Sequence, residues 1–201
     1  MRIATTVVCA LALSPALALS AHLNARAADP GLTLNVVVSD RSTAGGAALG
    51  TARTRADYVF ADVGIRIAWM TPGQTPAIAN IGERYIQLVV TDGARVDQGV
   101  PSRDPILGFA IPSANRVYVY YDRVETLALR RNIQPGWFLG VVIAHELTHV
   151  LLPESGHTPT GVMASVLVPD PKEPLTFTDD EGRAMRARLS GETTLARLGI
   201  R

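Results

Sequence analysis

Three of the four histidines in the chain, together with two glutamates, fall in a single short segment. His145, Glu146 and His149 form a His-Glu-x-x-His pattern, and His157 follows shortly afterwards. Side chains four residues apart project from one face of an α-helix, so the two imidazoles of the pattern can bind the same cation. The pattern therefore predicts a zinc-binding helix of the kind found in metal-dependent hydrolases, with Glu146 as the general base.

A zinc site that carries out hydrolysis keeps three protein ligands and leaves one position for water. His157 is the leading candidate for the third ligand. Pro153 ends the helix after His149, and Gly156 allows a tight turn that brings the chain back toward the same cation. Glu154 remains an alternative third ligand on the same connection.

These residues together predict a hydrolytic mechanism. Zn²⁺ would polarise a substrate carbonyl and activate a water molecule, from which Glu146 would take a proton. Glu146 would then pass this proton to the leaving amine. No other titratable side chain is needed.

The composition is that of a single globular domain. The chain has 201 residues, of which 47% are hydrophobic and 18% charged, and its formal net charge is +1. The sequence contains no cluster of basic residues, so we expect no nucleic-acid partner. We expect a monomer that acts on a peptide or protein substrate.

The N-terminus resembles a secretory signal. Arg2 precedes the apolar stretch 3–19, and small residues at Ala25 and Ala27 suit cleavage after Ala27. We therefore expect a signal peptide at 1–27 and a catalytic domain at 28–201. An uncleaved membrane anchor is the alternative interpretation.

The single cysteine, Cys9, lies inside this leader. The mature chain would then carry no disulfide and no thiolate metal ligand. We expect the protein to be secreted or periplasmic, with no stable membrane association once the leader is removed.

Hydrophobic patterning predicts a mixed α/β fold in which most of the sheet precedes the motif helix. We expect strands at 32–38, 65–69, 84–91 and 115–121, and helices at 47–63, 137–152 and 178–189. Residues 107–111 form a short apolar segment, and 124–131 a short helix or turn. Thr178, followed three residues later by Glu181, predicts a capping box at the start of the last helix.

The segment His145-Glu146-Leu147-Thr148-His149, then His157, then Gly161-Val162-Met163 resembles the metzincin clan of zinc metallopeptidases. The resemblance implies an α+β fold of the zincin type and a zinc-dependent endopeptidase activity. It also implies that Met163 occupies a Met-turn, as an apolar floor under the histidines and not as a ligand. A plain core methionine is the alternative interpretation of Met163.

The resemblance extends to residues 107–112, which are similar to the edge strand that lies along bound peptide in matrixin-like members. An exposed edge can pair with an extended substrate through backbone hydrogen bonds. An ordinary buried strand is the alternative.

The chain departs from the metzincin pattern between the second and third histidines. Leu152 stands where the family has a glycine, and the connection to His157 is longer. A ligand from a later helix, at residues 179–181, would suit a different zincin layout. Ser165 stands where some members carry a tyrosine.

The longer connection motivates a second hypothesis of a different class. The chain could be a catalytically weak zinc-binding or protein-interaction domain that retains the metzincin-like fold. A third possibility is that zinc only stabilises an exported domain that lacks disulfides.

Overall fold

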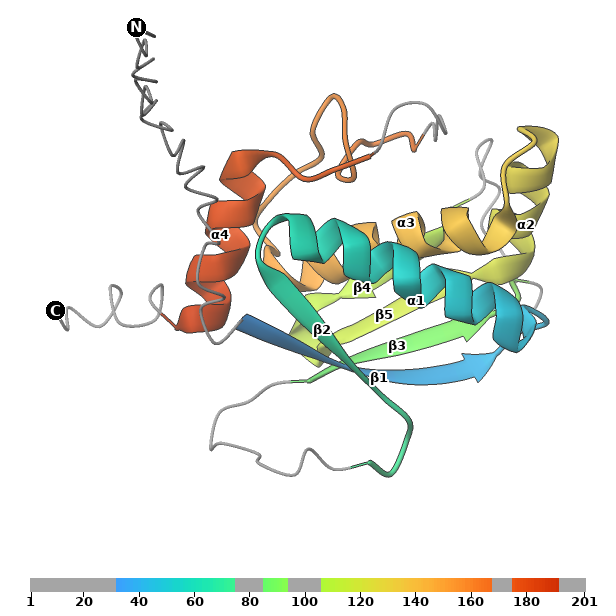
Figure 1. Cartoon of the computed structure of the whole chain (residues 1–201), viewed down its shortest axis with the longest axis horizontal. Coiled ribbons are helices and arrows are strands. Elements are labelled where there is room, and N and C mark those ends of the chain that lie inside the picture. Colours follow the sequence, from blue (N-terminus) through green and yellow to red (C-terminus); the bar gives the residue numbers. More distant parts are fainter. Residues whose placement is uncertain (1–31, 75–84, 94–105, 168–174, 192–201) are drawn as a thin grey trace, which may run out of the picture.

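The computed structural model describes residues 32–74, 85–93, 106–167 and 175–191. The predicted signal peptide lies outside this part of the chain. One twisted sheet carries the helices α1 and α3 side by side over one face, with α2 and α4 toward its two ends (Figure 1). Among the described helices, none has the length and apolar character needed to span a bilayer.

The sheet has five strands in the order β2-β1-β3-β5-β4. Strands β1, β2, β3 and β5 run parallel, and β4 pairs antiparallel with β5 at one edge. The elements are β1 (Leu32–Arg41), α1 (Gly45–Asp62), β2 (Ile65–Met70), β3 (Tyr85–Thr91), β4 (Gly108–Ile111), the 3-10 turn η2 (Pro112–Ala114), β5 (Arg116–Tyr120), α2 (Tyr121–Arg130), α3 (Pro135–Leu151) and α4 (Asp179–Ser190).

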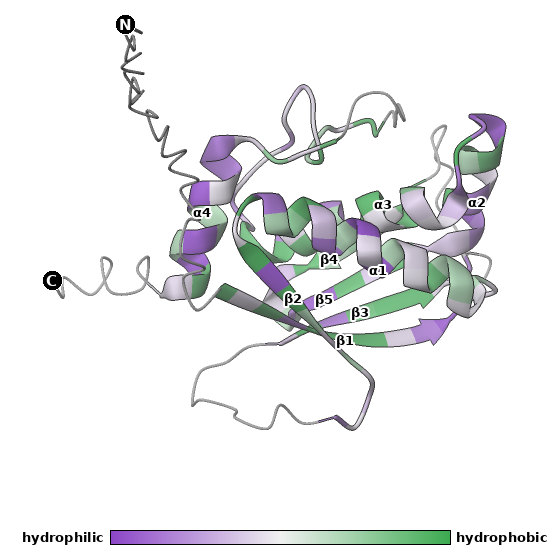
Figure 2. Cartoon of the chain, viewed as in Figure 1, coloured by the Kyte–Doolittle hydropathy of each residue, from purple (hydrophilic) through white to green (hydrophobic). Residues whose placement is uncertain are grey.

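The core lies between the sheet and the two helices that cover it. Strand β1 shows how the sequence produces this arrangement, because Leu34, Val36 and Val38 alternate toward the helices and are almost completely buried. Apolar residues, drawn green in Figure 2, run along the strands and the helices packed on them, whereas much of the purple lies on α2 and α4.

Helices α1 and α3 pack unusually closely because α3 presents glycines to α1. A Cβ at Gly136 would lie 2.7 Å from the carbonyl oxygen of Ala48, and one at Gly140 only 2.5 Å from that of Ala52. Any larger side chain would push the two helices apart. This contact fixes the position of α3 over the sheet, and therefore the position of the histidines that α3 carries.

The boundaries of α3 follow from local sequence. The Gln134 side chain accepts a hydrogen bond from the Trp137 amide at the N-cap, and Pro135 occupies the first turn. Apolar residues cover most of the helix surface, as expected for a helix buried on nearly all sides. The helix ends at Leu151, two residues before Pro153, which cannot continue it.

The predicted mixed α/β fold is confirmed, and most predicted boundaries agree with the structure within a few residues. The strand predicted at 115–121 ends at Tyr120, because Tyr121 begins α2 instead and donates a hydrogen bond to Glu125 one turn later. The predicted capping box at the start of α4 is present, with reciprocal bonds between Thr178 and Glu181.

Candidate metal centre

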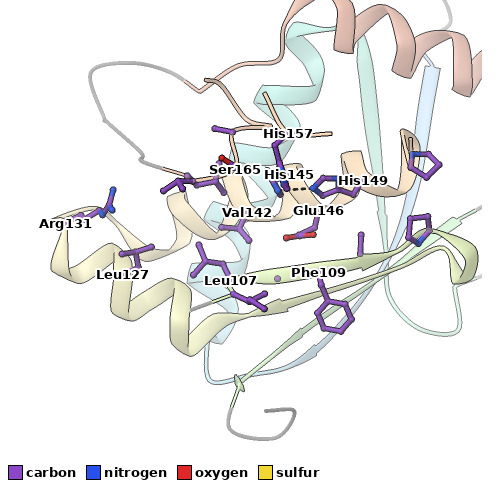
Figure 3. A pocket seen from close by; sticks show the side chains of 18 residues that line it. Leu107, Phe109, Leu127, Arg131, Val142, His145, Glu146, His149, His157 and Ser165 are labelled. Atoms are coloured by element: carbon purple, nitrogen blue, oxygen red, sulfur yellow. Dashed lines mark hydrogen bonds between the residues drawn. The ribbon is translucent and has the colours of Figure 1, made fainter. Parts of the chain in front are cut away.

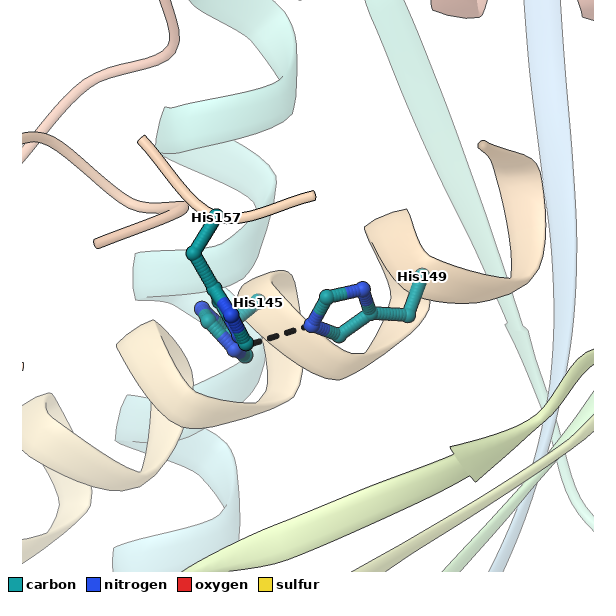
Figure 4. Close-up of side chains that lie close together, drawn as sticks. All are labelled: His145, His149 and His157. Atoms are coloured by element: carbon teal, nitrogen blue, oxygen red, sulfur yellow. Dashed lines mark hydrogen bonds between the residues drawn. The ribbon is translucent and has the colours of Figure 1, made fainter. Parts of the chain in front are cut away.

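Three imidazoles converge above the middle of α3. The ligand atoms of His145, His149 and His157 all lie within 4.8 Å of one another. The Nε2 atoms of His145 and His149 are 3.1 Å apart, and the His157 ring lies 5.2 Å and 5.0 Å from these two rings (Figure 4). Ligand nitrogens around one tetrahedral zinc are about 3.3 Å apart. The group is thus close to the geometry that one metal ion requires.

His145 is held in the orientation that a metal ligand needs. Its Nδ1 lies 2.7 Å from the carbonyl oxygen of Val162, which can only accept a hydrogen bond. Nδ1 therefore carries the proton, and Nε2 is left with a free lone pair facing His149. A backbone carbonyl from a different segment thus sets the tautomer of this histidine.

The surroundings favour the neutral imidazoles that bind metals. Burial lowers the pKa of His145, and the neighbouring His157 lowers it further against the effect of the Val162 hydrogen bond. Burial and the two neighbouring histidines lower the pKa of His149 to about 4. Neutral imidazole nitrogens suit Zn²⁺ as borderline ligands, so the donor set fits this ion.

The connection between α3 and His157 turns early. The Ser155 amide donates to the Leu152 carbonyl oxygen at 3.0 Å, so the chain reverses within the first residues after the helix. Gly156 does not adopt a left-handed conformation, and a Cβ there would meet no atom within 4 Å. The expectation that Gly156 enables the turn is therefore wrong, because Gly156 has an ordinary backbone conformation.

The segment after His157 is anchored at Thr158. Its amide donates to the Met163 carbonyl oxygen at 2.9 Å, and its hydroxyl donates to the Thr160 carbonyl oxygen at 2.9 Å. The same hydroxyl oxygen lies 3.4 Å from a carboxylate oxygen of Glu181 on α4. Gly161 supplies the left-handed residue of the following turn, with φ of +83°. The loop that carries His157 is thus tied to both the following turn and the last helix.

The alternative ligands are placed differently. Glu154 is exposed and is not part of the group of metal-binding side chains found among the described residues. Glu181 is engaged in the capping box of α4, and Asp180 pairs with Arg183 at the surface. Met163 is 1% exposed and belongs to the hydrophobic core, directly after the residue whose carbonyl orients His145.

Glu146 is buried beside this group. Its side chain is 6% exposed, and burial raises the pKa of its carboxyl to about 8. Gly108 of β4 approaches it so closely that a Cβ there would lie 3.0 Å from Glu146 Oε1 and 2.7 Å from the Tyr118 carbonyl oxygen. Only glycine at this position leaves the carboxylate its present place.

The three histidines and Glu146 open into one cavity of about 660 Å³. In Figure 3 the carboxylate of Glu146 points toward β4, while His157 descends from the opposite side. The walls come from β4 and the residues flanking it, α2, α3 and the turn after Met163. Of the two alternatives for residues 107–112, the edge position agrees with the structure, because β4 pairs on one side only among the described strands.

Several residues of the cavity escaped the sequence analysis. Leu127 and Arg131 line it from the end of α2, and Val166 from the turn after the last histidine. Their four-residue spacing marks Leu127 and Arg131 as neighbours on one helix face, but nothing in the sequence connects that face with the histidines.

Sequence comparison finds no match to any known family profile or to any curated protein. Solved structures do match. The archaemetzincin AmzA of Methanopyrus kandleri superimposes with a TM-score of 0.51 at 14% identity, over 81% of this chain and 98% of that one. A zinc-dependent peptidase of Methanocorpusculum labreanum matches at a TM-score of 0.45 and 14% identity, over 77% of this chain and 99% of that one. The match to the archaemetzincin shows that this chain shares its fold.

Proposed function

We propose that this protein is an exported zinc-dependent endopeptidase with His145, His149 and His157 as the metal ligands. One observation carries the proposal: three imidazoles lie within 4.8 Å of one another in a cavity that also receives the Glu146 carboxylate. The shared fold supports it, since the protein that shares the fold is described as an archaemetzincin.

Bound zinc supplies Lewis-acid polarisation of the substrate carbonyl and lowers the pKa of water. The residues of the chain do the rest. Glu146 accepts the proton of the attacking water and delivers it to the leaving amine. Burial raises the pKa of its carboxyl to about 8, which makes the ionised carboxylate a stronger base than an exposed one.

Substrate positioning falls to strand β4. Its outer edge has no partner among the described strands, and Gly108, Phe109 and Ala110 line the cavity. An extended peptide can add to this edge by backbone hydrogen bonds, which would carry its scissile bond past Glu146. Met163, buried just after Val162, would act as the apolar support beneath the histidines.

The decisive experiment replaces Glu146 with Gln. This variant should bind zinc as wild type does and lose peptide cleavage by at least about 100-fold, because general acid–base catalysis contributes that much. Zinc content and cleavage of a quenched-fluorescence peptide library are measured on the same samples. Cleavage that survives the change would refute the assigned base.

The same pair of samples addresses the binding hypothesis. A wild-type protein that holds one zinc ion and cleaves no library member would be a binding domain that retains the fold. The exposed position of His157 and its longer connection favour that second candidate over a purely structural zinc.

Export is a separate part of the proposal. It rests on Arg2, the apolar stretch 3–19 and the small residues before Ala28. N-terminal sequencing of protein recovered from outside the cytoplasm should begin at Ala28. Recovery of the intact chain from the membrane fraction would favour the anchor instead.

A further inference from the structure

The cavity that holds the histidines is asymmetric in charge. Among its described lining residues, Glu146 is the one carboxylate and Arg131 the one arginine, and no lysine contributes. Arg131 is the C-cap of α2. In Figure 3, Arg131 and Leu127 lie at one end, Val142 lies between, and the histidines lie beyond it.

The wall between the two ends is apolar. It comprises Leu107, Leu127, Val142 and Leu167, with Ile106 and Val166 beside them. Ile106 is 48% exposed and Val166 67%, which places both among the few large apolar side chains that the described surface exposes. Exposed apolar groups that line a cavity indicate contact with an apolar part of a ligand.

The Arg131 guanidinium is available to a ligand. Arg131 is exposed, and no hydrogen bond or ion pair of its side chain occurs in the described part of the chain. Arg123, on the same helix, is committed instead, since it donates to the Ile106 carbonyl oxygen at 2.8 Å and covers the Tyr120 ring at 4.5 Å. A guanidinium binds a carboxylate through two parallel hydrogen bonds.

The spacing between the charged end and the histidines limits where such a carboxylate can sit. Arg131 is close in sequence to Gln134, the N-cap of α3. From Gln134 to His145 the helix rises about 16 Å at the usual 1.5 Å per residue. An extended peptide covers about 3.4 Å per residue. A carboxylate bound by Arg131 would therefore lie within about five residues of the scissile bond.

Resting on the proposed peptidase function, we propose that Arg131 determines specificity by binding a substrate carboxylate across the apolar wall. The favoured substrate is an acidic peptide that carries apolar side chains near the scissile bond and a carboxylate within reach of Arg131. That carboxylate belongs either to an Asp or Glu side chain or to a free C-terminus.

The test compares matched peptides that differ only in this group. One set moves a single Glu or Gln through each position of an apolar peptide with an amidated end, and another compares free and amidated C-termini. We expect wild type to favour one carboxylate position by about three- to tenfold in kcat/KM, mainly through KM. In Arg131→Gln the ratio of kcat/KM between the matched Glu and Gln peptides should fall to about one. Arg131→Glu should instead favour a peptide with Lys at the same position.

Arg130→Gln is the matched control, because Arg130 is an exposed neighbour that does not line the cavity. It should keep the full preference, which should also weaken as salt screens the pair. A preference that persists in Arg131→Gln, or wild type that favours no carboxylate at any position, would overturn the proposal. Unchanged unfolding midpoints verify that the variants are folded.

A second readout separates this proposal from the peptidase function itself. The affinities of zinc-loaded Glu146→Gln and of the double variant with Arg131→Gln for the same labelled peptides are measured by fluorescence anisotropy. If wild type cleaves nothing but carboxylate preference in binding depends on Arg131, the peptidase function fails and the carboxylate site stands. If cleavage occurs without charge preference, only the Arg131 proposal fails.

Discussion

The candidate metal centre joins two regions that differ in what holds them. His145 and His149 stand on a helix buried on almost every side, and the register of that helix alone sets their separation. His157 stands on an exposed loop whose place depends on the bonds of Thr158 to Met163 and Glu181. The helical pair is therefore a rigid half-site, and the loop histidine is the half that tertiary contacts must place.

The largest effect should come from removing ligands from each half. His149→Ala should lower zinc affinity by more than about 100-fold and abolish cleavage, since even outer-shell changes at metal sites cost 10- to 100-fold. His157→Ala should also lose zinc, while Glu154→Ala should retain it. Zinc content after dialysis against a weak chelator measures this. Equal zinc retention in His157→Ala and wild type would remove His157 from the site.

The next largest effect concerns the base on the rigid half. In Gly108→Ala the new Cβ would meet Glu146 Oε1 at 3.0 Å and the Tyr118 carbonyl oxygen at 2.7 Å. Displacing a catalytic group by about an ångström can reduce the rate by about 100-fold. We expect kcat to fall by that order while zinc content stays unchanged, measured by peptide cleavage and metal analysis.

Gly50→Ala is the control for this change, because a Cβ at Gly50 in α1 would meet no atom within 4 Å. It should leave kcat unaltered. Full activity in Gly108→Ala would mean that β4 can move away from Glu146 without cost, and the base would then not depend on the edge strand.

The two regions also differ in how far the sequence predicts them. The helical pair and Glu146 follow from local spacing, and the strands follow from alternating burial such as that of β1. The capping box of α4 was equally local. These features depend on residues close together in the chain, which is why pattern alone finds them.

The sequence predicts that His157 joins the helical pair, but it places the turn that allows this at the wrong residue. The convergence of His157 with the helix depends on Thr158 bonds that span several segments, and the turn begins at Leu152–Ser155 and not at Gly156. The Val162 carbonyl that orients His145 and the cavity position of Arg131 arise only from packing. Neither leaves a local signal in the sequence.

The third prediction tests the loop half through its own glycines. Gly161→Ala should destabilise the protein by about 2 kcal/mol or more, because a left-handed conformation costs an L-residue that much. Its Cβ would also lie 2.7 Å from the Thr176 carbonyl oxygen. Zinc affinity should fall as well, since the turn leads directly to the Val162 carbonyl. Chemical denaturation and zinc titration measure the two effects.

Gly156→Ala is the matched control within the same loop. It has ordinary backbone angles and open space around its Cβ position, so stability should stay within about 1 kcal/mol or rise slightly. Equal losses in both variants would show that the loop tolerates no added side chain anywhere, and the distinction between the two glycines would fail.

The smallest effect comes from the link between the loop and α4. Glu181→Ala removes one half of the capping box and the contact to Thr158, so stability should fall by about 1 kcal/mol. Glu181→Gln keeps a capping side chain but removes its charge, and Asp180→Ala removes only an exposed pair with Arg183.

If Glu181 positions His157, zinc affinity should fall severalfold in Glu181→Ala and stay unchanged in Asp180→Ala. A loss of stability in Glu181→Ala with unaltered zinc affinity would show that Glu181 only caps the helix. The position of His157 would then depend on the hydrogen bond from Thr158 to Met163 and not on α4.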